Sequence, residues 1–395
     1  MAKATNGLSP NWDAVLARSQ VTAEGTKAIE GDMGIDEPLS PREVLNDFNP
    51  HMESIEGLLG PATPSGHTQQ QRLVSSDDGQ SVPILATQRR LAEITEMIHV
   101  ASLLHDDVID ASSLRRGEPS APAAFGNKLS ILGGDFLLGR ASVALARLRD
   151  NEVVELLATV IANLVEGEVM QLRAQSGAES TAPSKSAFST FWQQQATPAQ
   201  QDASAAAGGP TEAMFEHYMQ KTYLKTAALI GKSARASVIL GGFSSSPLSS
   251  SSLSSRSGSG PEASVKDAAY SYGRNVGMAF QLIDDVLDFK STSAAFGKPS
   301  GGADLRLGLA TAPVLFAWQE IGHKLGELVH RKFEGPGDVE KALGLVQNQS
   351  TGLQRTEELA KQHVQLAIDA LHTLPWTEAR DGLQGLAEQV INRIK

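Results

Sequence analysis

The sequence contains no cysteine. The chain can therefore form no disulfide, hold no metal ion through a thiolate and use no cysteine nucleophile, which leaves oxygen ligands for a hard metal ion. Basic residues are also few, because 34 Lys and Arg stand against 45 Asp and Glu and give a net charge of −11. Nucleic-acid binding draws on clustered Lys and Arg, so we expect no nucleic-acid partner.

Long apolar stretches and a clear targeting segment are lacking as well. No uninterrupted apolar run approaches the roughly 18 to 20 residues that span a bilayer, so we expect any membrane contact to be peripheral. The N-terminal segment contains Asp13, Glu24 and Glu30, whereas a mitochondrial presequence is poor in acids and rich in Arg. The N-terminal residues therefore indicate no compartment.

Apolar residues recur at helical spacing through most of the chain. In segment 90–110 they fall at Ile94, Met97, Ala101, Leu104 and Val108, a three-and-four pattern that predicts one apolar face. Segment 265–289 repeats the pattern, and strand-like alternation is rare. Further helices are predicted at about 129–149, 152–173, 212–240, 305–318 and 352–371. The sequence predicts an all-α helical bundle.

Composition divides the chain into two parts. Residues 1–85 mix Gly, Pro, Ser and charges, and we expect a variable, partly disordered N-terminal region. Residues 86–395 form the predicted helical domain. Two segments within it are compositionally biased: about 175–210 is rich in Ala, Gln and Ser, and Ser dominates at about 243–261. Their low apolar content predicts flexible insertions between helices.

Two aspartate motifs carry the functional signal. The first is Asp106, Asp107 and Asp110 at the end of a predicted helix, and the second is Asp284, Asp285 and Asp288 at the end of another. Carboxylates four residues apart lie on one helical face and repel each other, which makes sense if divalent cations sit between them. Mg²⁺ suits carboxylates completed by substrate phosphates. One such motif could be a solvated acidic helix end, but a second copy disfavours that interpretation.

Basic residues lie close to both motifs in the sequence. Arg and Lys can bind diphosphate oxygens, although each one alone is more commonly a surface cation. His99 shares a helical face with Asp106 and can be read either as a ligand or as an ordinary core histidine. The basic candidates are Arg115, Arg116, Lys225 and Lys298.

These residues, taken together, resemble the trans-isoprenyl diphosphate synthases, and among them the long-chain type that makes the ubiquinone side chain in fungal mitochondria. The similarity runs from about Thr87 to the C-terminus. It includes LLHDDVIDASSLRRGEPS, GGDFLLGRAS, LVEGEVMQLRA, YLKTAALIGKSARA, AFQLIDDVLDF and GKPSGGADLRLG.

The resemblance implies an isoprenoid synthase-type bundle around a central cavity and a catalytic role for several residues. All six motif aspartates would hold Mg²⁺ on an allylic diphosphate, which Arg115, Lys225 and Lys298 would clamp. His99 and Arg116 would bind isopentenyl diphosphate. Thr226 and Gln281 would lie near the allylic cation. The growing tail would pass Ala101 and Ser102, whose small size predicts a long product. The implied catalytic set is Asp106, Asp107, Asp110, Lys225, Thr226 and Gln281.

The chain departs from the family in one segment. A Gly-Lys-x-x-Arg-Pro motif that normally contacts isopentenyl diphosphate is absent between Gly57 and Gln88. This keeps open a second hypothesis, a noncatalytic or weakly active subunit of a heteromeric synthase. A terpene cyclase is disfavoured by the second aspartate motif, and a purely structural bundle would bind no allylic diphosphate. The family further implies a homodimer or heteromer and a mitochondrial location.

Overall fold

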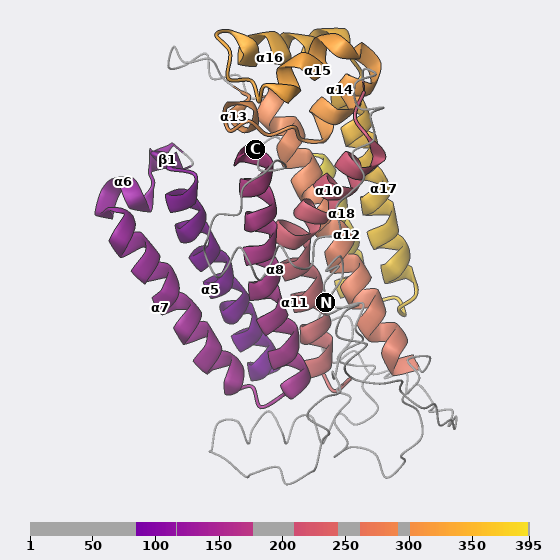
Figure 1. Cartoon of the computed structure of the whole chain (residues 1–395). Helices are drawn as coiled ribbons and strands as arrows, with labels where there is room; N and C mark the ends of the chain where they lie inside the picture. The colour runs from indigo at the N-terminus through magenta and orange to yellow at the C-terminus, as the bar shows by residue number, and fades with distance from the viewer. Residues whose placement is uncertain (1–83, 116, 177–208, 244–260, 291–300, 394–395) are drawn as a thin grey trace, which may run out of the picture.

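The computed structural model describes residues 84–115, 117–176, 209–243, 261–290 and 301–393 (Figure 1). Regular structure in this part is almost wholly helical, which confirms the all-α prediction. A single short hairpin, β1 (Leu114–Arg115) paired antiparallel with β2 (Glu118–Pro119), follows the first aspartate motif. The N-terminal region 1–83 and most of the predicted insertions at 175–210 and 243–261 lie outside the described residues.

One half of the bundle packs around a first core. It consists of α5 (Ala86–Ile109), α7 (Asn127–Ala146), α8 (Asn151–Ser176) and α11 (Ala228–Leu240), with the short α6 (Ala121–Phe125) at one end. Ile94, from the apolar stripe predicted for α5, lies in this core with Leu156 of α8 and Ile239 of α11. Ile98, which the predicted stripe did not include, is buried there as well. Burial of these side chains removes apolar surface from water and stabilises the packing.

The other half packs around α12 (Pro261–Lys290) and α17 (Gly352–His372). Its core contains Leu282, Val286 and Phe289 of α12 together with Trp318. The remaining helices surround these two: α10 (Glu212–Thr222), α13 (Ala303–Arg306), α14 (Ala312–Ile321), α15 (His323–His330), α16 (Asp338–Gln349) and α18 (Glu378–Ile391). Figure 1 shows α13 to α16 gathered at the end of the bundle where α12 finishes.

Glycines allow the two halves to approach closely. A Cβ at Gly277 of α12 would lie 2.6 Å from the Cα of Ala227, and one at Gly273 would lie 2.7 Å from the carbonyl oxygen of Ile230 in α11. Such distances leave no room for a side chain, so these glycines set how near α12 lies to the chain around Ala227. Residues of both segments belong to the site described below.

Three features differ from the sequence-based prediction. The helix predicted at 305–318 is divided into α13 and α14, because Gly308 has a φ of 77° and Pro313 fits only near a helix start. The helix predicted at 212–240 contains a π-helical turn, η3 (Tyr223–Ala227). The helices α15, α16 and α18 were not predicted.

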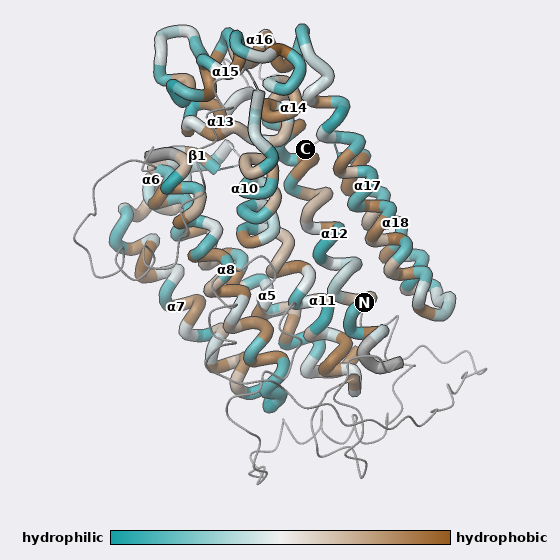
Figure 2. The backbone as a smooth tube through the Cα atoms, turned by 45° about the vertical axis from the view of Figure 1, so that its right-hand side comes forward, coloured by the Kyte–Doolittle hydropathy of each residue, from teal (hydrophilic) through white to brown (hydrophobic). Residues whose placement is uncertain are grey.

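Helix α7 also differs from the expectation about membrane contact. By length and composition alone it is long and apolar enough to cross a membrane, with a mean hydropathy of 1.4 over a stretch that is 22% buried. Lys128, Asp135 and Arg140 interrupt it, so it is not an unbroken apolar run. Core helices of soluble proteins meet the same criterion, and α7 packs along α5 at the edge of the bundle (Figure 2).

Candidate functional site

The first aspartate motif forms the last turn of α5. Asp110 caps the helix, and Ala111 then takes a φ of 50°, a left-handed conformation uncommon for a residue other than glycine. Asp107 is buried, and the Nε of Arg115 donates to its two carboxylate oxygens at 2.9 and 3.0 Å. The structure therefore pairs two predicted site residues with each other, and the β1–β2 hairpin positions Arg115 for this contact.

Asp106 and Asp110 occupy the other side of that turn. Within the described chain, their carboxylates accept no hydrogen bond and form no ion pair. Burial raises the pKa of Asp106 to about 6, Lys225 lowers it, and the negative charges of Glu168 and Asp110 raise it further. Burial also raises the pKa of Asp110. The positive charges of Lys225 and Arg115 lower the pKa of both carboxylates, so cations favour their ionised forms.

The π-helical turn η3 places Lys225 and Thr226 between the two motifs. A π-turn inserts an extra residue into a helix and is frequent at functional sites. Lys225 points toward α8, where its Nζ lies 2.5 Å from Oε2 of Glu168 and donates to Oε1 of Gln171 at 3.1 Å. Thr226 points toward α12, where its hydroxyl donates to Oε1 of Gln281 at 2.9 Å. The turn thus connects α8 to α12.

The second motif ends α12, and Asp285 is its buried member. Its Oδ2 accepts a hydrogen bond of 2.6 Å from the hydroxyl of Tyr218, and its Oδ1 accepts one of 3.0 Å from Nε2 of Gln281. Burial raises the pKa of Asp285, while Lys221 and the two hydrogen bonds lower it. Thr226, Gln281 and Asp285 therefore form a continuous hydrogen-bonded chain.

The outer aspartates of this motif have other partners. Asp288 accepts hydrogen bonds from the backbone N–H groups of Ala303 at 3.0 Å and Asp304 at 3.3 Å, at the start of α13. Asp284 contacts the guanidinium of Arg393, which lies over the ring of Phe280 with its Cζ 3.9 Å from the ring centroid. Burial, together with Asp285 and Asp288, raises the pKa of Asp304 to about 7.

The two acidic groups face a common cation. Lys225 lowers the pKa of Asp106 and Asp110, in the first motif, and also that of Asp304, beside the second. The ammonium of Lys225 therefore acts on carboxylates of the first motif and on one beside the second. Carboxylates at both motifs that share one lysine suit a metal-bound diphosphate.

The other predicted residues are less closely joined to this site. His99 is exposed on α5, about two turns before Asp106. Ala101 is fully buried, and Ser102 is partly exposed with its hydroxyl bonded to the carbonyl of His99 at 2.8 Å. Arg116 and Lys298 lie outside the described residues, as does the segment in which the Gly-Lys-x-x-Arg-Pro motif is missing.

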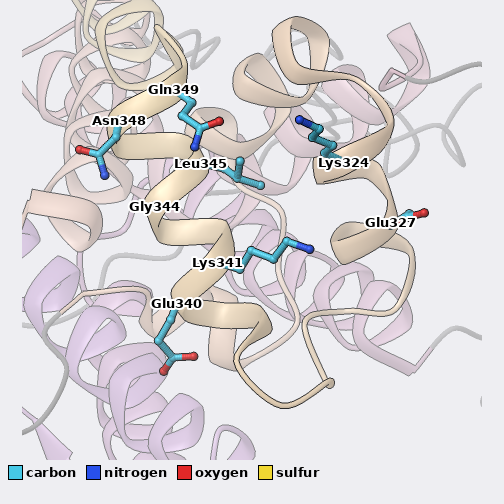
Figure 3. Close-up of a pocket in the computed structure, with 8 residues that line it drawn as sticks. All are labelled: Lys324, Glu327, Glu340, Lys341, Gly344, Leu345, Asn348 and Gln349. Atoms are coloured by element: carbon cyan, nitrogen blue, oxygen red, sulfur yellow. The ribbon is translucent and has the colours of Figure 1, made fainter.

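A cavity of about 540 Å³ lies elsewhere, between α15 and α16 (Figure 3). Its lining includes two basic and two acidic side chains, Lys324, Lys341, Glu327 and Glu340. No residue of either aspartate motif lines it, and it is open to solvent. We therefore assign the chemistry to the motif helices and not to this cavity.

The motif residues fit a metal that is completed by substrate. Among the described residues, no group of three or more His, Asp or Glu lies close enough to enclose an ion. Mg²⁺ keeps several waters and is usually held by one or two carboxylates plus phosphate oxygens. Asp106 and Asp110, a partly buried pair four residues apart at the end of α5, are such a ligand set.

Several residues at the site were missed from the sequence. Glu168 and Gln171 lie in the quoted segment LVEGEVMQLRA, and Asp304 lies in GKPSGGADLRLG, so the family resemblance contained a signal for them. The sequence contained no signal for Tyr218 or Arg393. Tyr218 lies on α10 and Arg393 just after the end of α18, and both reach the site only through the fold.

An all-α bundle with an aspartate motif at the end of each of two long helices defines the isoprenoid synthase class. Residues 76–346 match the polyprenyl synthetase family, and the chain belongs to that family. It is 45% identical to the probable mitochondrial hexaprenyl pyrophosphate synthase of Yarrowia lipolytica, over 95% of this chain and 70% of the relative. The corresponding Neurospora crassa protein is 46% identical over 96% of this chain and 72% of its own length. The chain is a polyprenyl diphosphate synthase, a prenyltransferase.

Solved structures agree with this assignment. A decaprenyl diphosphate synthase from Rhodobacter capsulatus matches with a TM-score of 0.59 and 29% identity, over 78% of this chain and 83% of that one. A Caulobacter crescentus polyprenyl synthase, complexed with calcium and isoprenyl diphosphate, matches with a TM-score of 0.59 and 25% identity. The match covers 97% of this chain and 96% of that one. The family is metal-dependent, in keeping with the carboxylates at this site.

Proposed function

We propose that this long-chain polyprenyl diphosphate synthase uses Mg²⁺ to condense isopentenyl diphosphate with an allylic diphosphate, and that its product supplies the ubiquinone side chain in mitochondria. The observation that carries the proposal is the pair of aspartate motifs at the ends of α5 and α12, with Lys225 acting on carboxylates of the first and beside the second. The curated fungal relatives are named as mitochondrial hexaprenyl pyrophosphate synthases, which supports the compartment and the long product.

Some residues of the site would bind metal ions, and others would bind the diphosphate and stabilise its charge. Asp106 and Asp110 would hold metal ions on one side of the diphosphate, with Asp284, Asp285 and Asp288 on the other. Lys225 would clamp the diphosphate oxygens directly. Arg115, paired with Asp107, would contribute positive charge beside the first motif. Bound Mg²⁺ supplies the charge that makes diphosphate a good leaving group.

In the condensation, the allylic C–O bond breaks and its electron pair leaves with the diphosphate. Thr226 and Gln281 would turn their oxygen dipoles toward the resulting allylic cation. The double bond of isopentenyl diphosphate then forms the new C–C bond, and the released diphosphate takes the proton that is lost. No side-chain nucleophile is needed, because the protein contributes positioning and electrostatics. His99, Arg116 and Lys298 complete the proposed substrate contacts.

We also propose that two copies of the chain associate through α7. The exposed apolar side chains of this helix recur at Leu129, Leu132, Phe136 and Val143, a spacing that forms one stripe along the helix. Exposed apolar patches of this kind mark interaction surfaces. A second copy presenting the same stripe would cover it by two-fold symmetry.

The test of the function is turnover by the purified full chain alone. It is incubated with magnesium, farnesyl or geranylgeranyl diphosphate and labelled isopentenyl diphosphate, and the products are separated by length. Magnesium-dependent long polyprenyl products, abolished in Asp106→Ala, support a self-sufficient synthase. Product that forms only when a second synthase subunit is added would support the alternative, a subunit of a heteromeric enzyme. The name of a Schizosaccharomyces pombe relative, decaprenyl-diphosphate synthase subunit 1, keeps that alternative open.

A further inference from the structure

A buried carboxylate on α8 lies beside the diphosphate-binding lysine. Glu168 is 8% exposed, and both of its carboxylate oxygens are shielded from solvent. Its only close contact with a cation in the described chain is the 2.5 Å ion pair to Nζ of Lys225. Gln171, one turn further along α8, accepts the 3.1 Å hydrogen bond from the same ammonium.

The backbone is shaped to bring the lysine to this carboxylate. A Cβ at Gly167 would lie 2.7 Å from Cγ of Lys225 and 3.1 Å from Cβ of Leu224. The missing side chain at Gly167 therefore leaves room for the lysine stem to lie against α8. The π-helical turn η3 supplies the lysine at that level of the bundle.

Packing alone does not account for a glutamate at this position. A buried ion pair contributes little net stability compared with apolar residues of similar volume, because both charges lose their hydration. The pair also faces the first motif, since the charge of Glu168 acts on Asp106 and Asp110, as does that of Lys225. Another carboxylate beside these two aspartates raises the pKa of both and so opposes the ionised forms that bind a metal ion.

We infer that Glu168, assisted by Gln171, is a positioning residue that holds Lys225 toward the first aspartate motif and acts on diphosphate binding through that lysine. The inference rests on the proposed function, in which Lys225 clamps the diphosphate. A free lysine side chain samples many rotamers, and ordering it opposes binding. A lysine already held by two partners loses less freedom when the diphosphate arrives.

The experiment measures binding of a non-reacting thiolo analogue of farnesyl diphosphate to the full chain, in the presence of magnesium, by titration calorimetry. Glu168→Gln removes the charge and keeps the shape, and we expect its affinity for the analogue to fall about tenfold, the effect of one charge-assisted contact. Glu166→Gln is the matched control, because Glu166 lies on the same helix and acts on Lys232 instead of Lys225. We expect it to bind like the wild type.

A double-mutant cycle separates positioning from a structural effect. In a Lys225→Met background, Glu168→Gln should cause no further loss of affinity, because its effect passes through the lysine. An equal loss in both backgrounds would overturn the inference, and so would unchanged or tighter binding by Glu168→Gln alone.

A further variant covers the case in which Glu168→Gln does not fold. Gln171→Leu removes the neutral partner of Lys225, and we expect about threefold weaker binding that again disappears in the Lys225→Met background. Unchanged binding by this variant would contradict the inference. Failure of the wild-type chain to bind the analogue at all would instead overturn the proposed function, so the two failures are distinguishable.

Discussion

The hydroxyl of Tyr218 on α10 donates a 2.6 Å hydrogen bond to the carboxylate of Asp285, which is buried at the end of α12. Together with the amide of Gln281, it satisfies both oxygens of a carboxylate that has little access to water. These two donors favour the ionised form of Asp285, the form that binds a metal ion, against the effect of burial.

Removing the Tyr218 hydroxyl should therefore weaken metal binding. In Tyr218→Phe, the pKa of Asp285 should rise further, and the magnesium concentration for half-maximal activity should increase several-fold at neutral pH. We also expect the loss of this buried hydrogen bond to lower the free energy of unfolding by about 1–2 kcal/mol. Magnesium titrations of activity and urea unfolding measure the two effects.

Tyr272→Phe is the matched control for this change. The hydroxyl of Tyr272 donates to the carbonyl oxygen of Leu383 at 2.8 Å, between α12 and α18 and away from the motifs. We expect a similar loss of stability but no change in the magnesium requirement. An equal magnesium shift in both variants would contradict a specific role for Tyr218.

Asp106 should make the metal-free protein sensitive to pH. Its pKa of about 6 in the folded chain exceeds the ordinary value of 3.8. The folded state thus binds the proton more tightly, so the contribution of Asp106 to stability is full below about pH 4 and is lost as the pH rises through about 6. Asp106→Asn should consequently be more stable than the wild type by about 2 kcal/mol at about pH 8, allowing for solvent screening, and equally stable at about pH 4.

Urea unfolding with a chelator present, across this pH range, measures the difference between the two proteins. At high pH, added magnesium and diphosphate should reduce the difference in free energy of unfolding between Asp106→Asn and the wild type. Asp369→Asn on the exposed face of α17 provides the control and should leave the pH dependence unchanged. Stability curves for Asp106→Asn and wild type that run parallel from about pH 4 to about pH 8 would argue against the burial effect.

The prediction of the fold from sequence succeeded where apolar periodicity was long and uninterrupted, as in α5, α8, α12 and α17. It was wrong between α13 and α14, where the apolar pattern continues through a backbone turn at Gly308. It also missed η3, because the π-helical turn changes the hydrogen bonding but leaves the apolar pattern intact. The short cap helices α15 and α16 carry too few turns for a periodic signal.

For the site, the sequence could indicate which residues carry the chemistry but not which of them contact one another. The pairing of Asp107 with Arg115 depends on the turn of the β1–β2 hairpin, and the neighbours of Lys225 depend on the packing of α8 against η3. The contact between Asp284 and Arg393 joins segments far apart in the sequence. Only the fold supplies such information.

A bulky residue one turn before the first motif should shorten the product. Each helical turn of about 5.4 Å is close to the length of one isoprene unit. Ser102 is only partly buried, so Ser102→Phe can place its ring in the proposed tail path without overpacking the core. We expect products shorter than those of the wild type, measured by chromatography of the labelled polyprenols.

Two further variants test whether the position of the introduced ring, as well as its size, determines the product length. Ala101 is fully buried, so Ala101→Phe should also shorten the product but lower the free energy of unfolding by about 1–3 kcal/mol through overpacking. Thr373→Phe, at the exposed end of α17, is the control and should leave the product length unchanged. Wild-type product lengths from Ser102→Phe would contradict a tail path along this side of α5.

The apolar stripe of α7 should hold two copies of the chain together. Phe136 lies within the stripe and is 67% exposed. Because a two-fold interface would bring the same helix of each copy together, Phe136→Glu should place two buried negative charges near each other and convert the dimer to a monomer. Light scattering after size-exclusion chromatography measures the mass.

Leu366→Glu makes the same kind of change at a 52% exposed site on α17 and should leave the mass unchanged. A wild-type chain that is monomeric at all concentrations, or a dimer that survives Phe136→Glu, would contradict this assignment of the interface.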